Sequence, residues 1–183
     1  MGDFDKEKRD FLNKKDKSRK QSIDEDIKEL IELINSSGNY YTTSSCSGRI
    51  MLMKVGKKNE SEWLIKLHDT TNDFGEFQEK PGENLYFKYE PPIIHICCKT
   101  INDAQRLLTC AKDSGFKKSS IINIEPRIVI EILSSERVEA PFWDVSKDYL
   151  SCLITEANKK LLLGKEKLDR LHEKLKNETK NKN

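Results

Sequence analysis

The sequence has 183 residues, which suffices for one domain with a substantial core and falls short of two ordinary domains. Its 33 basic and 31 acidic residues leave a formal net charge of +2, so the chain lacks the overall positive field that holds any polyanion. A nucleic-acid partner would therefore need a local basic patch.

Neither a membrane segment nor a metal site is expected. No apolar run approaches the roughly 20 residues that span a bilayer, and the start, MGDFDKEKRD, resembles neither a secretory signal nor a transit peptide. The five cysteines are odd in number and show no CxxC spacing, which disfavours a disulfide framework and a zinc finger. We therefore expect a cytoplasmic protein with reduced thiols, no metal ion and no membrane partner.

A polar, lysine-rich arm at residues 1–21 precedes the first predicted core helix. The arm contains the basic run KKDKSRK, which either contacts phosphates or is a solvated segment. Ser22 and Glu25 match a capping box, in which a hydroxyl and a carboxylate each bind a backbone N–H at the helix start. The helix would end at Gly38 and bury one apolar stripe, formed by Ile23, Ile27, Leu30, Ile31 and Ile34.

From Tyr40 onward the apolar residues alternate with the period of β-strands. The runs NYYTT, RIMLMKV and EWLIKL predict an antiparallel meander, with a turn in the stretch TTSSCSGRI at residues 42–50. A polar stretch at residues 68–84 predicts a long surface loop. Two strands follow in LYFKY and IIHICCK, and the second is expected to be central because it is apolar on both faces.

The rest of the chain predicts a helix, three strands and a long helix. Thr100 caps the first helix and Gly115 ends it. SSIINI and RIVIEIL are strands, and ERVEAPF is expected to return as a hairpin through Ser134 and Ser135. A long amphipathic helix begins at Ser146.

This order of elements predicts an α+β fold with an antiparallel or mixed sheet, packed helices and a long C-terminal helix. A single domain would span residues 22–175, between the arm and a frayed polar tail at residues 176–183. No glycine-rich loop follows a strand and opens a helix, so the fingerprint of Rossmann-type folds is absent.

The stretch TTSSCSGRI has three interpretations. As a nucleophile, Cys46 would need a neighbouring base, and no spacing in the sequence provides one. As a ligand cradle, the serine hydroxyls and the amides around Gly48 would hold an anion while Arg49 clamps a carboxylate or phosphate. As a turn, the serines would bond their own backbone. The pattern leaves turn and cradle equally open.

Two histidines are candidates for proton transfer. His95 lies within IIHICC and is either a general base lining a cleft or a core histidine with one hydrogen bond. His68 ends a strand at the long loop, and Glu90 precedes two prolines that could aim its carboxylate at the same place. Trp63 is a core or a stacking residue.

Six stretches in the same order resemble the wybutosine-synthesizing protein 3 family from about residue 4 to about residue 170. They are KDKSRKQSID, YYTTSSCSGRI, EWLIKLHD, FKYEPPIIHICCK, AQRLLTCAKDSGFKKSSI and YLSCLITEANKKL. The resemblance implies a tRNA methyltransferase that uses S-adenosylmethionine and is not of the Rossmann type. Its implied substrate is a ring nitrogen of a tricyclic guanosine derivative, 3′ of the anticodon in phenylalanine tRNA.

The chemistry of methyl transfer assigns candidate roles to residues of this chain. His95 or His68 would be the base, with Glu90 orienting it or accepting the proton. The candidate cofactor cradle is Ser44, Ser45, Ser47, Gly48 and Arg49, where Arg49 would clamp either the carboxylate of the cofactor or a tRNA phosphate. The candidate RNA contacts are Lys17, Ser18, Lys20, Trp63 and Asn158. The family pattern also falls on Asp24, to which no role is assigned. The chain departs from the family pattern at Gln21 and Ser120, where glycine is favoured.

Two other functions remain open at this point. The chain could be a non-catalytic module that binds tRNA and presents the modified base to a partner enzyme, which agrees with the basic arm and the missing cofactor fingerprint. A thiol-dependent hydrolase built on Cys46 ranks last, because no base for the thiol is evident.

Overall fold

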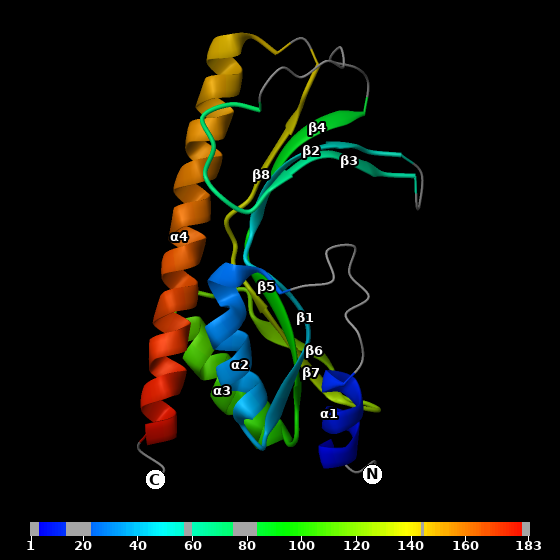
Figure 1. The fold of residues 1–183 in the computed structure, drawn as a ribbon, viewed down its shortest axis with the longest axis vertical. Helices are drawn as coiled ribbons and strands as arrows, with labels where there is room; N and C mark the ends of the chain where they lie inside the picture. The colour runs from blue at the N-terminus through cyan, green and yellow to red at the C-terminus, as the bar shows by residue number, and fades with distance from the viewer. Residues whose placement is uncertain (1–3, 14–22, 57–59, 75–83, 144, 181–183) are drawn as a thin grey trace. The chain divides into compact units, whose positions relative to one another are not determined.

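The computed structural model describes residues 4–13, 23–56, 60–74, 84–143 and 145–180. The chain forms two compact units, which are described separately (Figure 1). The first unit comprises Met1–Ser47, Pro92–Ser135 and Glu166–Asn183, and the second comprises Gly48–Pro91 and Glu136–Lys165. The long helix α4, Lys147–Lys180, contributes its first half to the second unit and its second half to the first.

The first unit contains an antiparallel sheet in the order β1-β5-β7-β6, together with helices. Its strands are β1 Tyr40–Cys46, β5 Ile93–Cys98, β6 Ser120–Asn123 and β7 Ile128–Leu133. Its helices are α1 Phe4–Leu12, the 3-10 turn η1 Glu25–Ile27, α2 Lys28–Ser36, α3 Ile101–Asp113 and the end of α4.

Helices cover parts of both faces of this first sheet. Alternation along β5 directs Ile94, Ile96 and Cys98 into an apolar core with α2, α3 and the end of α4. On the other face, the Phe4 and Phe11 rings of α1 lie 5.4 and 5.5 Å from the Tyr41 ring. The apolar alternation of the strands thus fixes which side chains face the core.

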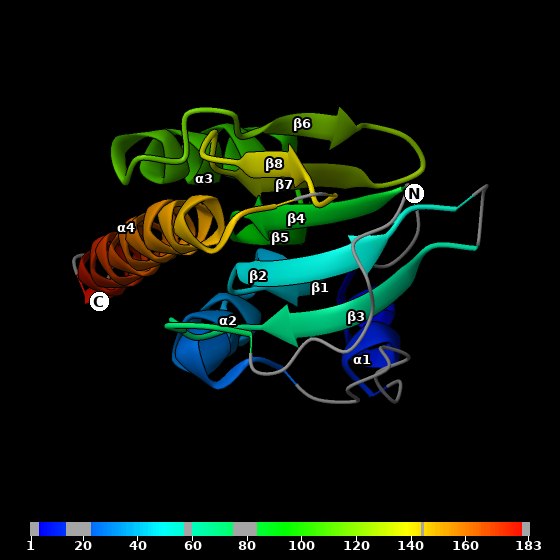
Figure 2. The ribbon, with the colours of Figure 1, turned by 90° about the horizontal axis from the view of Figure 1, so that it is seen from above.

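The second unit contains an antiparallel sheet in the order β3-β2-β4-β8 (Figure 2). Its strands are β2 Arg49–Lys54, β3 Glu62–Leu67, β4 Leu85–Glu90 and β8 Val138–Pro141. One face of the sheet, with Phe87 and Tyr89 at its centre, packs against Leu153, Ala157 and other apolar residues of α4. The Tyr89 hydroxyl donates a 2.9 Å hydrogen bond to the Lys160 carbonyl, which satisfies this buried polar group.

The predicted fold class is confirmed, since the protein is α+β with antiparallel sheets and a long C-terminal helix. None of the helices that the structure describes combines the length and apolar composition needed to cross a bilayer. The predicted loop at residues 68–84 falls in part on residues outside the described ranges, and residues 14–22 of the arm and its junction lie wholly outside them.

Two predicted strand pairings are wrong. β1 pairs with β5 in place of β2, so the first three strands form no meander, and the stretch at residues 42–50 is strand on both sides of a change of sheet. β8 pairs with β4 and not with β7, and buried Ser134 accepts a 2.7 Å hydrogen bond from Lys167 where a hairpin turn was expected. Alternation specifies a strand and its faces, whereas the partner depends on contacts distant in sequence.

The helix boundaries also differ from the prediction. Helical structure begins at Glu25 with Asp24 as the N-cap, Ser22 lies outside the described residues, and Ile23 is exposed. The Asp24 carboxylate makes no cap bond, because it binds Ser47. At the other end α4 continues to Lys180, past the predicted start of the tail, in a segment of good helix formers.

Gly115 offers a direct test of how α3 ends. Its φ is +105°, and an added Cβ would lie 3.2 to 3.3 Å from carbons of the Lys167 side chain. We expect Gly115→Ala to lower the free energy of unfolding by about 1–3 kcal/mol in chemical denaturation. Gly38→Ala is the control, since nothing lies within 4 Å of its added Cβ. Equal stability of the two variants would refute this account of the helix end.

The cysteines test the burial of the first core. Burial raises the pKa of Cys98 to about 12 and that of Cys110 to about 11, so both stay protonated and unreactive well above neutral pH. At about pH 8 iodoacetamide should alkylate exposed Cys152 in the native protein and reach Cys98 and Cys110 only after denaturation. Mass spectrometry of tryptic peptides measures this, and native labelling of Cys98 as fast as that of Cys152 would contradict it.

Candidate functional site

One extra residue in β1 decides which side chains share a face of the first sheet. Thr42 lies opposite Ile96, but Ser44 lies opposite His95, so Thr43 is inserted as a β-bulge. Without the bulge, alternation would place Ser44 on the face of Ile96, which belongs to the core. The bulge instead turns Ser44 toward the face of His95.

Asn35 of α2 binds the backbone at this bulge. The Thr42 N–H donates to Asn35 Oδ1 at 2.8 Å, and Asn35 Nδ2 donates to Thr42 Oγ1 at 3.1 Å. A bulge interrupts the regular ladder and leaves a backbone group to be satisfied by a side chain. The side chain of Asn35 therefore holds the irregular part of β1 in place.

A row of three polar side chains crosses the sheet next to the bulge. Ser44 Oγ lies 3.0 Å from His95 Nδ1, and His95 Nε2 lies 3.0 Å from Glu131 Oε2. The residues come from β1, β5 and β7 and lie directly opposite one another in the strand registers. Ser44 is exposed, whereas the side chains of His95 and Glu131 are 30% and 23% exposed. The row thus runs from the surface to partly buried groups.

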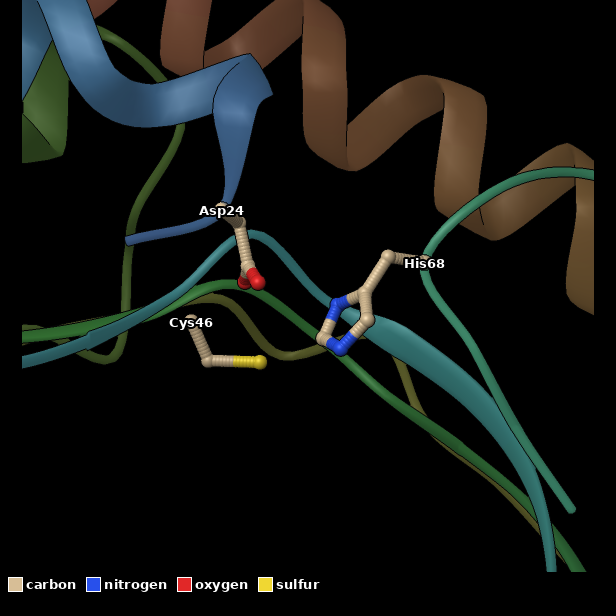
Figure 3. Close-up of side chains that lie close together, drawn as sticks. All are labelled: Asp24, Cys46 and His68. Carbon is tan, nitrogen blue, oxygen red and sulfur yellow. The ribbon is translucent and has the colours of Figure 1, made fainter. Parts of the chain in front are cut away.

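Ser47, two residues before β2 begins at Arg49, makes different contacts. Its N–H and its hydroxyl both donate to Asp24 Oδ2, at 2.9 and 3.1 Å, and both residues are buried. Figure 3 shows the Asp24 carboxylate and the Cys46 side chain. The hydroxyl of Ser47 therefore anchors the chain where β1 ends.

In the second unit, His68 contacts Gly48, the residue at which that unit begins. Gly48 has a φ of +98°, and its carbonyl oxygen lies 2.9 Å from Nδ1 of His68, whose ring is shown in Figure 3. A carbonyl can only accept, so Nδ1 of His68 carries a proton. The histidine thereby fixes the backbone at the left-handed glycine.

Arg49 and Glu90 form an ion pair on the second sheet. Nε and Nη2 of Arg49 both donate to Oε2 of Glu90, at 2.9 and 2.6 Å. The guanidinium carbon of Arg49 also lies 4.7 Å from the centre of the Trp63 ring, and the Lys66 ammonium lies 4.9 Å from it. Cations stacked on an indole are attracted by its ring electrons, so Trp63 and Glu90 together orient Arg49.

The second unit also contains Asn158, which holds the segment after β3. Its Oδ1 accepts from the Thr71 N–H at 3.1 Å, and its Nδ2 donates to the Thr71 carbonyl at 2.6 Å. Both ends of the amide are therefore engaged with the backbone of one residue. This pairing positions the start of the polar loop against α4.

The structure brings together some of the predicted site residues and separates others. Ser44 contacts His95, His68 contacts Gly48, and Arg49 contacts Glu90. Ser45 lies opposite Ile94 and so faces away from its neighbour Ser44. Glu90 was expected to orient a histidine, but its described partner is Arg49, and Glu131 binds His95. Lys17, Ser18 and Lys20 lie outside the described residues.

Sequence reasoning missed Glu131 and Asn35 as parts of the site. A charged residue within the apolar run RIVIEIL was the available signal for Glu131, because such a residue in a central strand needs a polar partner. Asn35 gave no comparable signal, since its role depends on a bulge that the alternation of TTSSCS does not mark.

The fold and the polar row define an α+β protein with two antiparallel sheets and a hydroxyl, an imidazole and a carboxylate in one line. Comparison with known proteins gives its family. The model of the family described as Methyltransferase TYW3 matches residues 6–177, so the chain belongs to that family. The resemblance drawn from the six sequence stretches is thereby confirmed.

Relatives from archaea and animals match most of the chain. A protein of Archaeoglobus fulgidus named tRNA(Phe) 7-((3-amino-3-carboxypropyl)-4-demethylwyosine(37)-N(4))-methyltransferase is 39% identical over 94% of this chain and 91% of its own. The human tRNA wybutosine-synthesizing protein 3 homolog is 32% identical over 93% of this chain and 71% of its own. A solved structure of a Pyrococcus horikoshii OT3 protein aligns with a TM-score of 0.81 at 36% identity, over 95% and 94% of the two chains.

The contact of Asn35 with the bulge is testable. Asn35→Ala removes the acceptor of the Thr42 N–H and should lower the free energy of unfolding by about 1–2 kcal/mol. Hydrogen exchange at the Thr42 amide should also become faster. Ser36→Ala is the control, because the exposed Ser36 hydroxyl bonds only its own helix at Leu33 among the contacts described. Unchanged exchange at Thr42 in Asn35→Ala would contradict the role given to Asn35.

Proposed function

We infer that the protein is a tRNA methyltransferase of wybutosine synthesis. Its proposed reaction adds a methyl group to N4 of 7-(3-amino-3-carboxypropyl)-4-demethylwyosine at position 37 of phenylalanine tRNA. The observation that carries this inference is the family match over residues 6–177, together with relatives that bear the name of this reaction and match more than nine-tenths of the chain. A tRNA substrate also agrees with the predicted cytoplasmic location.

The proposed methyl donor is S-adenosylmethionine, whose sulfonium supplies an electrophilic methyl group. Its amino-acid end carries a carboxylate and an ammonium, which match the opposite charges of Arg49 and Glu90. The Arg49 side chain is 23% exposed and oriented by Trp63, so its guanidinium is prepared to bind a carboxylate. We propose that Arg49, with the Gly48 backbone that His68 fixes, holds the amino-acid end of the donor.

Methylation of a ring N–H releases one proton, so the enzyme needs an acceptor. His95 is the proposed acceptor, because its imidazole is half-buried and bonded to a carboxylate at Nε2. A carboxylate partner favours the protonated imidazole that forms in the reaction. His68 is the second candidate, although its Nδ1 is engaged with the Gly48 carbonyl.

The RNA contacts expected from the sequence are proposed with one change. Trp63 is 38% exposed and is proposed to stack on a base, and Lys17, Ser18 and Lys20 are proposed to contact the tRNA. Asn158 is proposed to act indirectly, by holding the loop backbone at Thr71, since both ends of its amide are used there. Ser45 and Ser47 are not proposed as cradle residues, because Ser45 faces away from Ser44 and the Ser47 hydroxyl binds Asp24.

Mass spectrometry tests the reaction. Phenylalanine tRNA that carries the demethyl precursor is incubated with the protein and S-adenosylmethionine, and the nucleoside at position 37 should gain one methyl group. His95→Ala should reduce the rate by about 10²- to 10⁴-fold, the usual contribution of a general base. His172→Ala, a substitution in α4, is the matched control and should keep the wild-type rate. No methyl gain with the wild-type protein would refute the proposed function.

A further inference from the structure

The geometry of the polar row points to a proton path in which the substrate does not contact a histidine directly. We propose that the Ser44 hydroxyl receives the N4 proton and passes its own proton to His95, while Glu131 sets the tautomer of the ring. This inference rests on the proposed methyltransferase function and adds a positioning residue, Glu131, and a relay residue, Ser44.

Both ring nitrogens of His95 are occupied by hydrogen-bond partners. Nδ1 is bonded to Ser44 Oγ and Nε2 to Glu131 Oε2, each at 3.0 Å. The imidazole therefore contacts a substrate only by giving up one of these bonds. Ser44, the exposed member of the row, is the group that a substrate at this sheet face meets first.

The two partners of His95 determine the tautomer of its ring. An ionised carboxylate can only accept, so His95 Nε2 carries the proton that Glu131 binds. Nδ1 of the neutral ring is then the acceptor, and the bond at that end is donated by the Ser44 hydroxyl. A lone pair of Ser44 Oγ consequently remains available for a new donor. Both hydrogen bonds of the row are therefore donated in the same direction, from Ser44 to His95 and from His95 to Glu131.

Uncharged residues flank the polar row on both sides along the strands. The neighbouring cross-strand row on one side is Tyr41, Cys97 and Val129, which lies next to the Phe4 and Phe11 rings of α1. The neighbouring row on the other side is Cys46, Ile93 and Leu133. No charged side chain stands in either row, so within the described strands Glu131 is the carboxylate closest in register to His95. Partial burial strengthens their interaction relative to the surface.

The step is balanced in atoms and charge. The N4 lone pair forms the bond to the methyl carbon, and the carbon–sulfur bond breaks with its electron pair going to sulfur. The N4 proton moves to Ser44 Oγ as the Ser44 proton moves to His95 Nδ1. The resulting imidazolium is stabilised by Glu131 at Nε2 and later releases its proton to solvent.

Three variants test the relay. With tRNA and donor saturating, Ser44→Ala should lower kcat by about 10²-fold or more with KM little changed, because the lost interaction acts on the proton in transit. Ser44→Thr keeps the hydroxyl and should recover most of the rate. Ser120→Ala is the matched control, since Ser120 lies opposite Glu131 on the far side of the row and is exposed. Wild-type rates in Ser44→Ala would overturn the relay.

A spectroscopic measurement addresses Glu131 independently of activity. In the free wild-type protein, ¹⁵N NMR of His95 at a pH where the ring is neutral should show a protonated Nε2 and an unprotonated Nδ1. Glu131→Gln offers the ring both a donor and an acceptor, so the two tautomers should mix and kcat should fall by about 10-fold or more. An Nδ1–H tautomer in the wild type, or an unchanged spectrum in Glu131→Gln, would overturn the positioning role. Absence of methyl transfer by the wild type would refute the proposed function without affecting the tautomer result.

Discussion

The functional face of the first unit depends on one irregularity, the bulge at Thr43 in β1. A strand that alternates without interruption would direct Ser44 into the core with Ile96, and the hydroxyl would need a buried partner. The extra residue reverses the alternation and places Ser44 beside His95. Asn35 satisfies the backbone at the bulge, so a helix residue outside the polar row supports its geometry.

In the stretch from Thr42 to Arg49, some polar groups hold the backbone in place and others belong to the proposed site. Thr42 and Ser47 are bound by side chains of the first unit, Asn35 and Asp24, and thereby fix the two ends of the segment. Ser44 extends a hydrogen-bonded row, and Arg49 begins the second sheet in an ion pair with Glu90. A run that reads as a loose, hydroxyl-rich turn is therefore a strand end, an anchor and a change of sheet in succession.

The sequence predicted the elements well and their partners poorly. The helix at 101–113 and the strands of both sheets follow from local periodicity and from end signals such as Thr100 and Gly115. The pairing of β1 with β5 joins segments about fifty residues apart, and alternation carries no information about it. His95 was identified as a candidate from its own chemistry, but its partner Glu131 emerges only from the register of β5 and β7. The sequence did not reveal the bulge, because the run TTSS at residues 42–45 contains no apolar residue to mark a face.

The central claim is that Ser44, and not the His95 ring itself, meets the nitrogen that is methylated. The most direct measurement is a crystal structure of the protein with S-adenosylhomocysteine and an anticodon stem-loop that carries the demethylwyosine base. We expect N4 within about 3 Å of Ser44 Oγ, with the bonds from Ser44 to His95 and from His95 to Glu131 preserved. N4 bound directly to a ring nitrogen of His95, or out of reach of Ser44, would contradict it.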